Sequence, residues 1–100
     1  MLDWHRITGF DWDEGNSQKI LLKHGVTLAE VEQALLNEPL VVTPDVQHSR
    51  DETRFHALGH TDEGKLLHLV FTLRQNGTLL RVISARDMSK KERQRYEEET

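Results

Sequence analysis

Cationic side chains concentrate near the C-terminal end of this 100-residue sequence, where they could bind or act on a polyanion. Residues 81–95 contain six arginines and lysines and two acidic residues, a local charge of +4. Because the net charge of the chain is −4, the remaining sequence carries −8. Such asymmetry favours a localised anion site over general affinity for nucleic acid. The alternative is a solvated helix of mixed charge.

Arginines and hydroxyl residues also lie on three strand-like runs, where neighbouring strands would bring them within reach of one another. They are Arg54, Thr72, Arg74, Arg81 and Ser84, with Arg86 just after the third run. Guanidinium and hydroxyl groups suit cleavage of a phosphodiester by the 2′-OH of RNA, because they stabilise charge that develops on the phosphate. That reaction requires no metal ion. Basicity alone leaves both binding and cleavage open.

Arg81 has a specific expected position on its strand. Strict alternation puts its side chain on the face of Ile83 and Ala85. If helices cover that face, Arg81 must lie at the open edge or pair with an acid, since an unpaired buried charge is costly.

Six histidines raise the possibility of a metal site. His56 and His60 could share one face of a strand, yet no H-E-x-x-H or comparable ligand spacing occurs. The chain has no cysteine, which excludes disulfides and thiolate zinc sites. We therefore expect surface or hydrogen-bonded histidines, no metal ion and no cofactor.

Capping signals predict two helices in the first half of the chain. The first runs from an N-cap at Asn16 to about His24, and Gly25 supplies a left-handed stop. Thr27 and Glu30 form a capping box that opens the second helix, whose apolar stripe predicts one buried face.

A third helix is predicted at the C-terminal end. Ser89 and Glu92 form its capping box, and it runs to about Glu98. Only Met88 and Tyr96 are obvious apolar anchors, so this helix is polar nearly all round. Such a helix either docks weakly or is held by a partner.

Alternating and apolar runs predict the strands. Phe10 and Trp12 alternate with acids in a short strand, and residues 40–42 form a brief extended piece followed by a polar loop over 45–51. The main runs are Arg54–His60, Leu66–Leu73 and Leu79–Ala85, with Asn76-Gly77 as a hairpin turn. The order predicts an α+β fold. It has an antiparallel sheet of about four strands, two N-terminal helices on one face and a C-terminal helix, in a single domain over residues 1–100.

Several short motifs, in this order and spacing, cover the chain from about Phe10 to Glu98. They are FDWDEGN at 10–16, KHGV at 23–26, TRF at 53–55 with Gly59, VFTLR at 70–74, RVISAR at 81–86, and SKKER at 89–93 followed by Tyr96. Together these motifs resemble the BrnT family, the toxins of type II toxin–antitoxin modules.

The resemblance implies a RelE-like fold and a metal-independent ribonuclease that halts translation. It implies a BrnA-type antitoxin as partner, with operator DNA bound only through that antitoxin. The chain has no apolar run long enough for a membrane span and no signal peptide, so we expect a cytoplasmic protein without membrane contact.

Carried over by position, the resemblance also implies site residues. The implied catalytic residues are Arg54, Arg81, Arg86, Lys23 and His24, and the implied RNA-binding residues are Arg74, Thr72, Ser84, Lys90, Lys91 and Arg93. The three catalytic arginines would hold the scissile phosphate. Lys23 or His24 would contact RNA or move a proton.

Two positions depart from the family pattern. Members often carry Asn where this chain has Ile20, and Glu directly before Arg54, where this chain has Thr53. Glu52 lies one step earlier, and a shift of one residue is expected to put it on the opposite side of the strand.

Two other functions remain open at this stage. One is an inactive module of the same fold that binds an antitoxin and acts only in repressing transcription. The other is an RNA-binding protein without cleavage.

Overall fold

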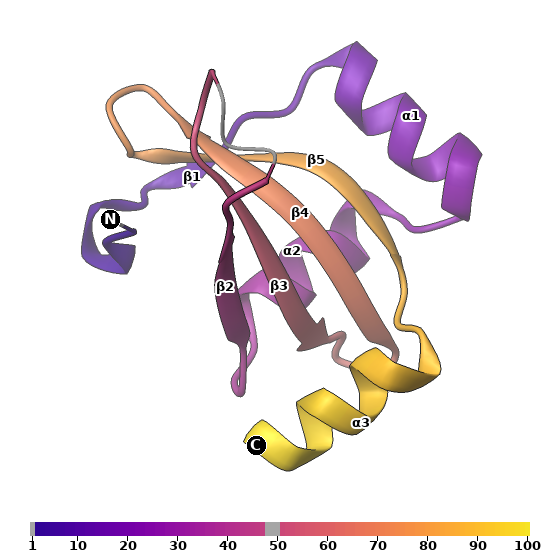
Figure 1. The fold of residues 1–100 in the computed structure, drawn as a ribbon. Helices are drawn as coiled ribbons and strands as arrows, with labels where there is room; N and C mark the ends of the chain where they lie inside the picture. Colours follow the sequence, from indigo (N-terminus) through magenta and orange to yellow (C-terminus); the bar gives the residue numbers. More distant parts are fainter. Residues whose placement is uncertain (1, 48–50) are drawn as a thin grey trace.

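The computed structural model describes residues 2–47 and 51–100, except the side chain of Leu22. Figure 1 shows a sheet with α2 behind it and α3 across its lower end. The elements, in chain order, are the 3₁₀ turn η1 (Trp4–Arg6), β1 (Gly9–Phe10), α1 (Glu14–His24), α2 (Leu28–Leu36), β2 (Val41–Asp45), β3 (Arg54–His60), β4 (Leu66–Arg74), β5 (Leu79–Asp87) and α3 (Lys90–Glu99).

The sheet has five strands in the order β1-β5-β4-β3-β2. Strands β2 to β5 form an antiparallel meander, and β1 pairs with β5 in parallel. The expected α+β class is therefore confirmed, whereas the expected sheet of about four antiparallel strands is corrected to a five-stranded mixed sheet. The pattern of alternating aromatics suggested a strand through Trp12, but only Gly9 and Phe10 pair with β5.

Local signals placed most element boundaries well. The capping box of Thr27 and Glu30 opens α2, and Gly25 ends α1 with φ 67°. The turn at Asn76-Gly77 joins β4 to β5, with positive φ at both residues. The polar loop expected over residues 45–51 falls partly outside the described residues, at 48–50.

The N-cap of α1 is Asp13, not Asn16. The Asp13 carboxylate accepts from the Asn16 backbone N–H at 3.0 Å, and the Asn16 amide oxygen accepts from the Asp13 backbone N–H at 2.8 Å. Both Asp and Asn can cap a helix. Here Asp13 is the N-cap, and Asn16, at the third helical position, completes the capping box. Asn16 then donates to the carbonyls of Asp11 and Val82, which ties the start of α1 to β5.

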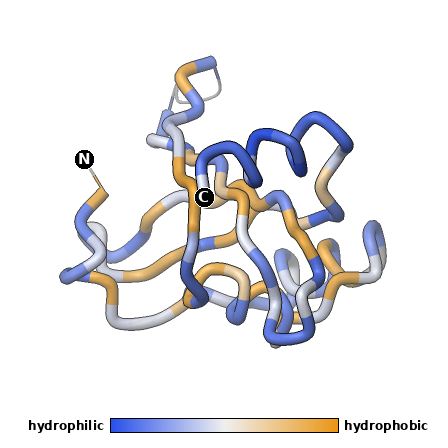
Figure 2. Tube along the Cα trace, turned by 90° about the horizontal axis from the view of Figure 1, so that it is seen from below, coloured by the Kyte–Doolittle hydropathy of each residue, from blue (hydrophilic) through white to orange (hydrophobic). Residues whose placement is uncertain are grey.

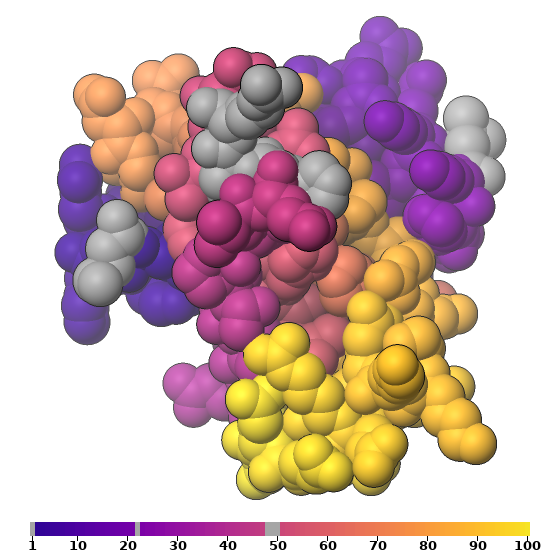
Figure 3. All heavy atoms as spheres, in the orientation of Figure 1, coloured from indigo at the N-terminus to yellow at the C-terminus, as the bar shows by residue number. Residues whose placement is uncertain are grey.

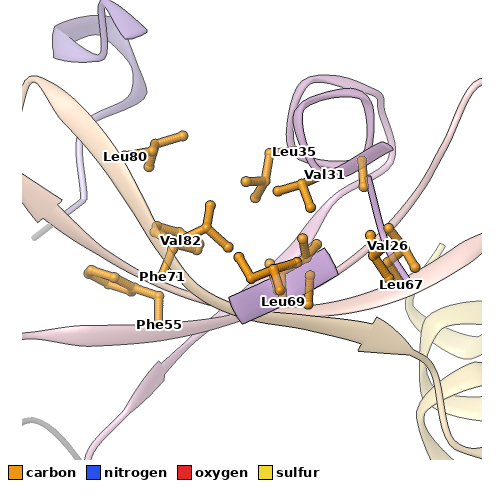
Figure 4. Close-up of a cluster of buried hydrophobic side chains, with 13 residues drawn as sticks. Val26, Val31, Leu35, Phe55, Leu67, Leu69, Phe71, Leu80 and Val82 are labelled. Atoms are coloured by element: carbon orange, nitrogen blue, oxygen red, sulfur yellow. The ribbon is translucent and has the colours of Figure 1, made fainter. Parts of the chain in front are cut away.

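The main core fills the space between the sheet and the two N-terminal helices, as expected. Figure 4 shows Val31 and Leu35 of α2 facing Leu69, Phe71 and Val82 of the sheet. The close fit is visible at Gly59, where an added Cβ would lie 2.5 Å from the Ala34 carbonyl oxygen. Alternate residues of β3 and β4 belong to this apolar face.

Helix α3 packs against the opposite face of the sheet, at one end. Its apolar contacts belong to a small cluster formed by Leu58, Met88 and Tyr96, against which Val41 and Leu66 pack. The Tyr96 hydroxyl donates to the Pro39 carbonyl at 2.6 Å and lies 3.0 Å from His60 Nδ1. Figure 2 draws α3 almost entirely in hydrophilic colours. The two expected anchors are confirmed, and polar contacts supplement them.

Candidate active site

The face of the sheet opposite α1 and α2 carries the polar residues of the three long strands. We call this surface the open face; α3 lies across its lower end (Figure 3). Register places Arg54 opposite Thr72, and Thr72 opposite Arg81. Because neighbouring strands are about 4.8 Å apart, these three residues form one row across the sheet.

A β-bulge decides which side chains of β5 reach the open face. Val82 pairs with Phe71, but Ser84 pairs with Val70, so Ile83 is an extra residue on β5. The extra residue reverses the alternation. Val82 and Ala85 consequently both lie in the core.

The expected face of Arg81 is therefore corrected. Alternation had grouped it with Ile83 and Ala85, whereas the bulge groups it with Ser84 and Arg86 on the open face. This change also resolves the expected burial problem, since Arg81 is not turned into the helix-covered core.

Arg81 is held by acidic residues from the segment before α1. Its Nη2 lies 2.9 Å from Asp13 Oδ2, and its Nη1 lies 3.5 Å from Asp11 Oδ2. The Asn16 backbone N–H, together with Arg81, lowers the pKa of Asp13. The Arg81 side chain is 22% exposed, so it stays accessible while the two carboxylates orient its guanidinium.

Glu52 joins the other two arginines at the start of β3. Its carboxylate accepts from Arg74 Nη1 at 2.5 Å and lies 3.9 Å from Arg54 Nε. Glu52 lies two positions before Arg54, so alternation would put both residues on one side of the chain and residue 53 on the other. The contact with Arg54 agrees with the expected change of side. The shifted glutamate thus still contacts the arginine.

Arg86 forms a bidentate ion pair between the sheet and α3. Its two terminal nitrogens lie 2.8 and 2.9 Å from the two carboxylate oxygens of Glu92. This bidentate bond lowers the pKa of Glu92 to about 2, and Glu92 also completes the capping box with Ser89.

Two histidines form a centre that the sequence patterns did not identify. His56 Nδ1 lies 3.0 Å from His68 Nε2, and His56 Nε2 lies 3.0 Å from Asp45 Oδ2. Asp45 and His68 are buried, whereas the His56 side chain is 36% exposed. The expectation of hydrogen-bonded histidines is confirmed. Their partnership across β2, β3 and β4 depends on strand register, for which a single sequence holds no signal.

A pocket of about 250 Å³ opens beside these histidines. His56, His68, Glu92 and Arg95 are among its lining residues. Within residues 2–47 and 51–100, no group of three or more histidine or acidic side chains is placed to hold a metal ion.

The other expected site residues lie on helices or elsewhere on the strands. Lys23 and His24 are exposed in the last turn of α1. Lys90, Lys91 and Arg93 are exposed near the start of α3. Thr72 is 1% exposed, and its hydroxyl donates to the Thr53 carbonyl at 2.7 Å. Its expected contact with RNA stays a prediction. The bond itself holds Thr72 to the residue before Arg54 and so helps to position the row. Ile20, one of the two departures, is a buried core residue.

Comparison with known families gives the decisive match. A family described as "Ribonuclease toxin, BrnT, of type II toxin-antitoxin system" matches residues 12–92. The chain belongs to this family. The match confirms the resemblance read from the sequence motifs and assigns the chain to the ribonuclease toxins of type II toxin–antitoxin systems. An antitoxin partner and an RNA substrate follow from that class.

A solved structure agrees with the assignment. The chain resembles the Brucella abortus ribonuclease toxin BrnT, known from a 1.1 Å crystal structure, with 26% identity and a TM-score of 0.62. The similarity covers 83% of this chain and 99% of that one. Comparison with curated proteins gave no significant match. In the described part of the BrnT chain, no helix is long and apolar enough to span a membrane.

Proposed function

We propose that this BrnT chain is a metal-independent endoribonuclease that inhibits translation. The 2′-oxygen of a nucleotide attacks the adjacent phosphorus, and the bond to the 5′-oxygen breaks. The products are a 2′,3′-cyclic phosphate and a 5′-hydroxyl end. Positive side chains, not a metal ion, stabilise the charge that develops on the phosphate oxygens.

The observation that supports this function best is the row formed by Arg54, Thr72 and Arg81 on the open face. A guanidinium has five N–H donors, and Arg81 meets carboxylates through only two of its nitrogens. Donors therefore remain for a phosphate. Because both arginines are partly buried, their charges act in a medium less polarisable than water, which strengthens them.

The remaining site residues have supporting parts in the proposal. Arg86 provides a third cation for the phosphate, and Lys23 or His24 contacts RNA or transfers a proton. RNA runs over the surrounding polar and basic side chains, which are Thr72, Arg74, Ser84, Lys90, Lys91 and Arg93.

The proposal extends to the partner and the setting. A BrnA-type antitoxin neutralises the chain, and operator DNA is bound only through that antitoxin. Residues 1–100 act as one domain in the cytoplasm, where translation takes place.

The experiment is cleavage of a long RNA by the purified chain in excess EDTA. We expect cleavage at the wild-type rate seen without EDTA, products with cyclic phosphate ends, and resistance at any site given a 2′-deoxynucleotide. Arg54→Ala should be strongly impaired, whereas the off-site control Lys65→Ala should cleave normally.

Failure would have a clear form. Absence of RNA cleavage, together with absence of growth arrest when the chain is expressed without an antitoxin, would contradict the enzyme. That result would favour the inactive module that acts only through its antitoxin.

A further inference from the structure

The chain Asp45–His56–His68 is an ordered path of hydrogen-bonding groups on the open face. Its two links are each 3.0 Å long and join β2, β3 and β4. Neither the implied catalytic residues nor the phosphate row gives this path a function. Its composition, a buried carboxylate followed by an imidazole, is one that orients a histidine for proton transfer.

The hydrogen-bond partners assign the protons. An ionised Asp45 can only accept a hydrogen bond, so His56 Nε2 must carry the hydrogen. In the neutral ring, His56 Nδ1 then carries a lone pair. His68 Nε2–H then donates to that lone pair. This leaves a lone pair on His68 Nδ1, which is buried without a hydrogen-bond partner. The opposite tautomer would bury an unpartnered N–H donor there, and such donors are rarer in native structures.

His68 can break its hydrogen bond to His56 and form another one. Its Nε2 lies 3.7 Å from Glu92 Oε2, and the bond from Arg86 keeps Glu92 ionised by lowering its pKa to about 2. The His68 N–H therefore has a second acceptor within a small movement. Once it turns to Glu92, the lone pair of His56 is free for a substrate hydroxyl.

His56 is also placed where a substrate can reach it. Its side chain is 36% exposed and lines the 250 Å³ pocket. It follows Arg54 by two residues on the same face of β3, a separation of about 7 Å along the strand. An arginine side chain is long enough to bind a phosphate whose neighbouring ribose lies against His56.

We propose that His56 is the general base that removes the 2′-OH proton during RNA cleavage, with Asp45 and His68 as positioning residues. This inference rests on the proposed ribonuclease function. The 2′-oxygen forms a bond to phosphorus as its proton passes to His56 Nδ1, and the bond from phosphorus to the 5′-oxygen breaks. The leaving oxygen takes a proton from water, and the imidazolium later returns its proton to solvent.

The surrounding charges suit this single proton transfer. Asp45 from β2 stabilises the imidazolium that forms on His56. Burial, with added repulsion from Arg86 of β5, lowers the pKa of His68, so that this ring stays neutral. Glu92 and Arg95 of α3 and Arg54 of β3 complete the charged groups around the pair.

The test uses the full chain, in EDTA, with an RNA oligonucleotide that spans a cleavage site mapped first on a long transcript. We expect His56→Gln to lower the single-turnover rate by about 10²-fold or more, the usual scale of a general base. The acid limb of the wild-type pH profile should disappear from its residual activity. His56→Ala should recover activity when imidazole is added, and the exposed control His5→Gln should match the wild type.

A second substrate distinguishes a base from an acid. An oligonucleotide with sulfur in place of the 5′-leaving oxygen needs no acid, so the defect of His56→Gln should persist on it. Should His56→Ala unfold in a thermal melt, His56→Gln carries the test, since its amide can still bond to Asp45.

The outcomes separate this inference from the enzyme itself. Normal cleavage by His56→Gln would contradict the role of His56 as general base, and so would a defect that vanishes with the sulfur leaving group. Wild-type cleavage in EDTA would still support the proposed ribonuclease function. No cleavage by the wild type would contradict the proposed function.

Discussion

The two faces of one sheet carry side chains of different chemistry, although they alternate along the same strands. Leu69 and Phe71 of β4 are buried in the main core, whereas His68 and Thr72, their immediate neighbours, point to the open face. On one side the strands supply apolar area, and on the other they supply guanidinium, imidazole and carboxylate groups. Alternation thus lets the same strands fold the chain and build a site.

The helices repeat this contrast. Helix α2 places Val31, Ala34 and Leu35 in the main core. Helix α3 buries Tyr96 alone and is otherwise held by Glu92, through Arg86 and a longer contact with His68. Apolar burial is insensitive to pH, whereas a carboxylate pair is not. The docking of α3 should therefore respond to pH more strongly than that of α2.

Leu69→Ala should produce the largest loss of stability, because Leu69 is 0% exposed and its removal leaves a cavity. We expect a decrease of about 2–5 kcal/mol in the free energy of unfolding. Urea denaturation measures this loss. The matched control is Val70→Ala on the open face, and an equal loss for the two variants would contradict the division between faces.

Gly59→Ala should have the next largest effect. The new Cβ would lie 2.5 Å from the Ala34 carbonyl oxygen and 3.0 Å from Leu40 Cδ1, so α2 must move away from the sheet. Overpacking of this kind costs about 1–3 kcal/mol. Gly9→Ala is the control, since its Cβ would meet only Leu79 Cδ2 at 3.7 Å. If both variants melt at the wild-type temperature, the contact between α2 and β3 is looser than described.

Glu92→Gln should lower stability by about 1 kcal/mol at neutral pH, because it breaks a bidentate but partly exposed pair. The folded-state pKa of Glu92 is lowered from 4.5 to about 2, so its stabilisation is complete above pH 4.5 and disappears as the pH falls through about 2. The wild type and the variant should therefore converge in thermal melts toward pH 2. A difference that stays constant with pH would contradict this role, and Glu99→Gln provides a control on the same helix.

Lys65→Ala should have the smallest effect. Its ammonium lies 3.6 Å from Glu30 and 3.9 Å from Asp87, and its side chain is 36% exposed. Exposed pairs of this kind contribute about 0.2–1 kcal/mol. Urea denaturation should show a loss at the low end of that range. A loss of stability as large as that of Glu92→Gln would contradict the expectation that the Lys65 ion pairs are weaker than the bidentate Arg86–Glu92 pair.

Local signals in the sequence determined much of the fold. The capping boxes of α2 and α3, the stop at Gly25 and the turn at Asn76-Gly77 act over a few residues, and each was predicted. The parallel pairing of β1 with β5 joins residues 70 positions apart, as in Gly9 with Leu79. No local pattern specifies such a contact.

The site was predictable only in part, for the same reason. The arginines of the row could be found by residue type, but the bulge at Ile83 decides the face of Arg81 and has no marker in the alternating run. Asp45, His56 and His68 become partners only when three strands take their register. Residue types therefore indicate the chemistry, while long-range pairing decides which residues share it.

The open face is the proposed place of RNA cleavage, and the cleavage rates of two arginine variants test this placement most directly. Arg81→Ala removes a guanidinium from the row, whereas Arg6→Ala removes an exposed one that donates to the Asn76 carbonyl elsewhere. In EDTA, with one RNA and under single-turnover conditions, Arg81→Ala should cleave about 10²–10³-fold more slowly than the wild type. Arg6→Ala should retain the wild-type rate. Equal rates for the two variants, with both chains folded, would contradict the account.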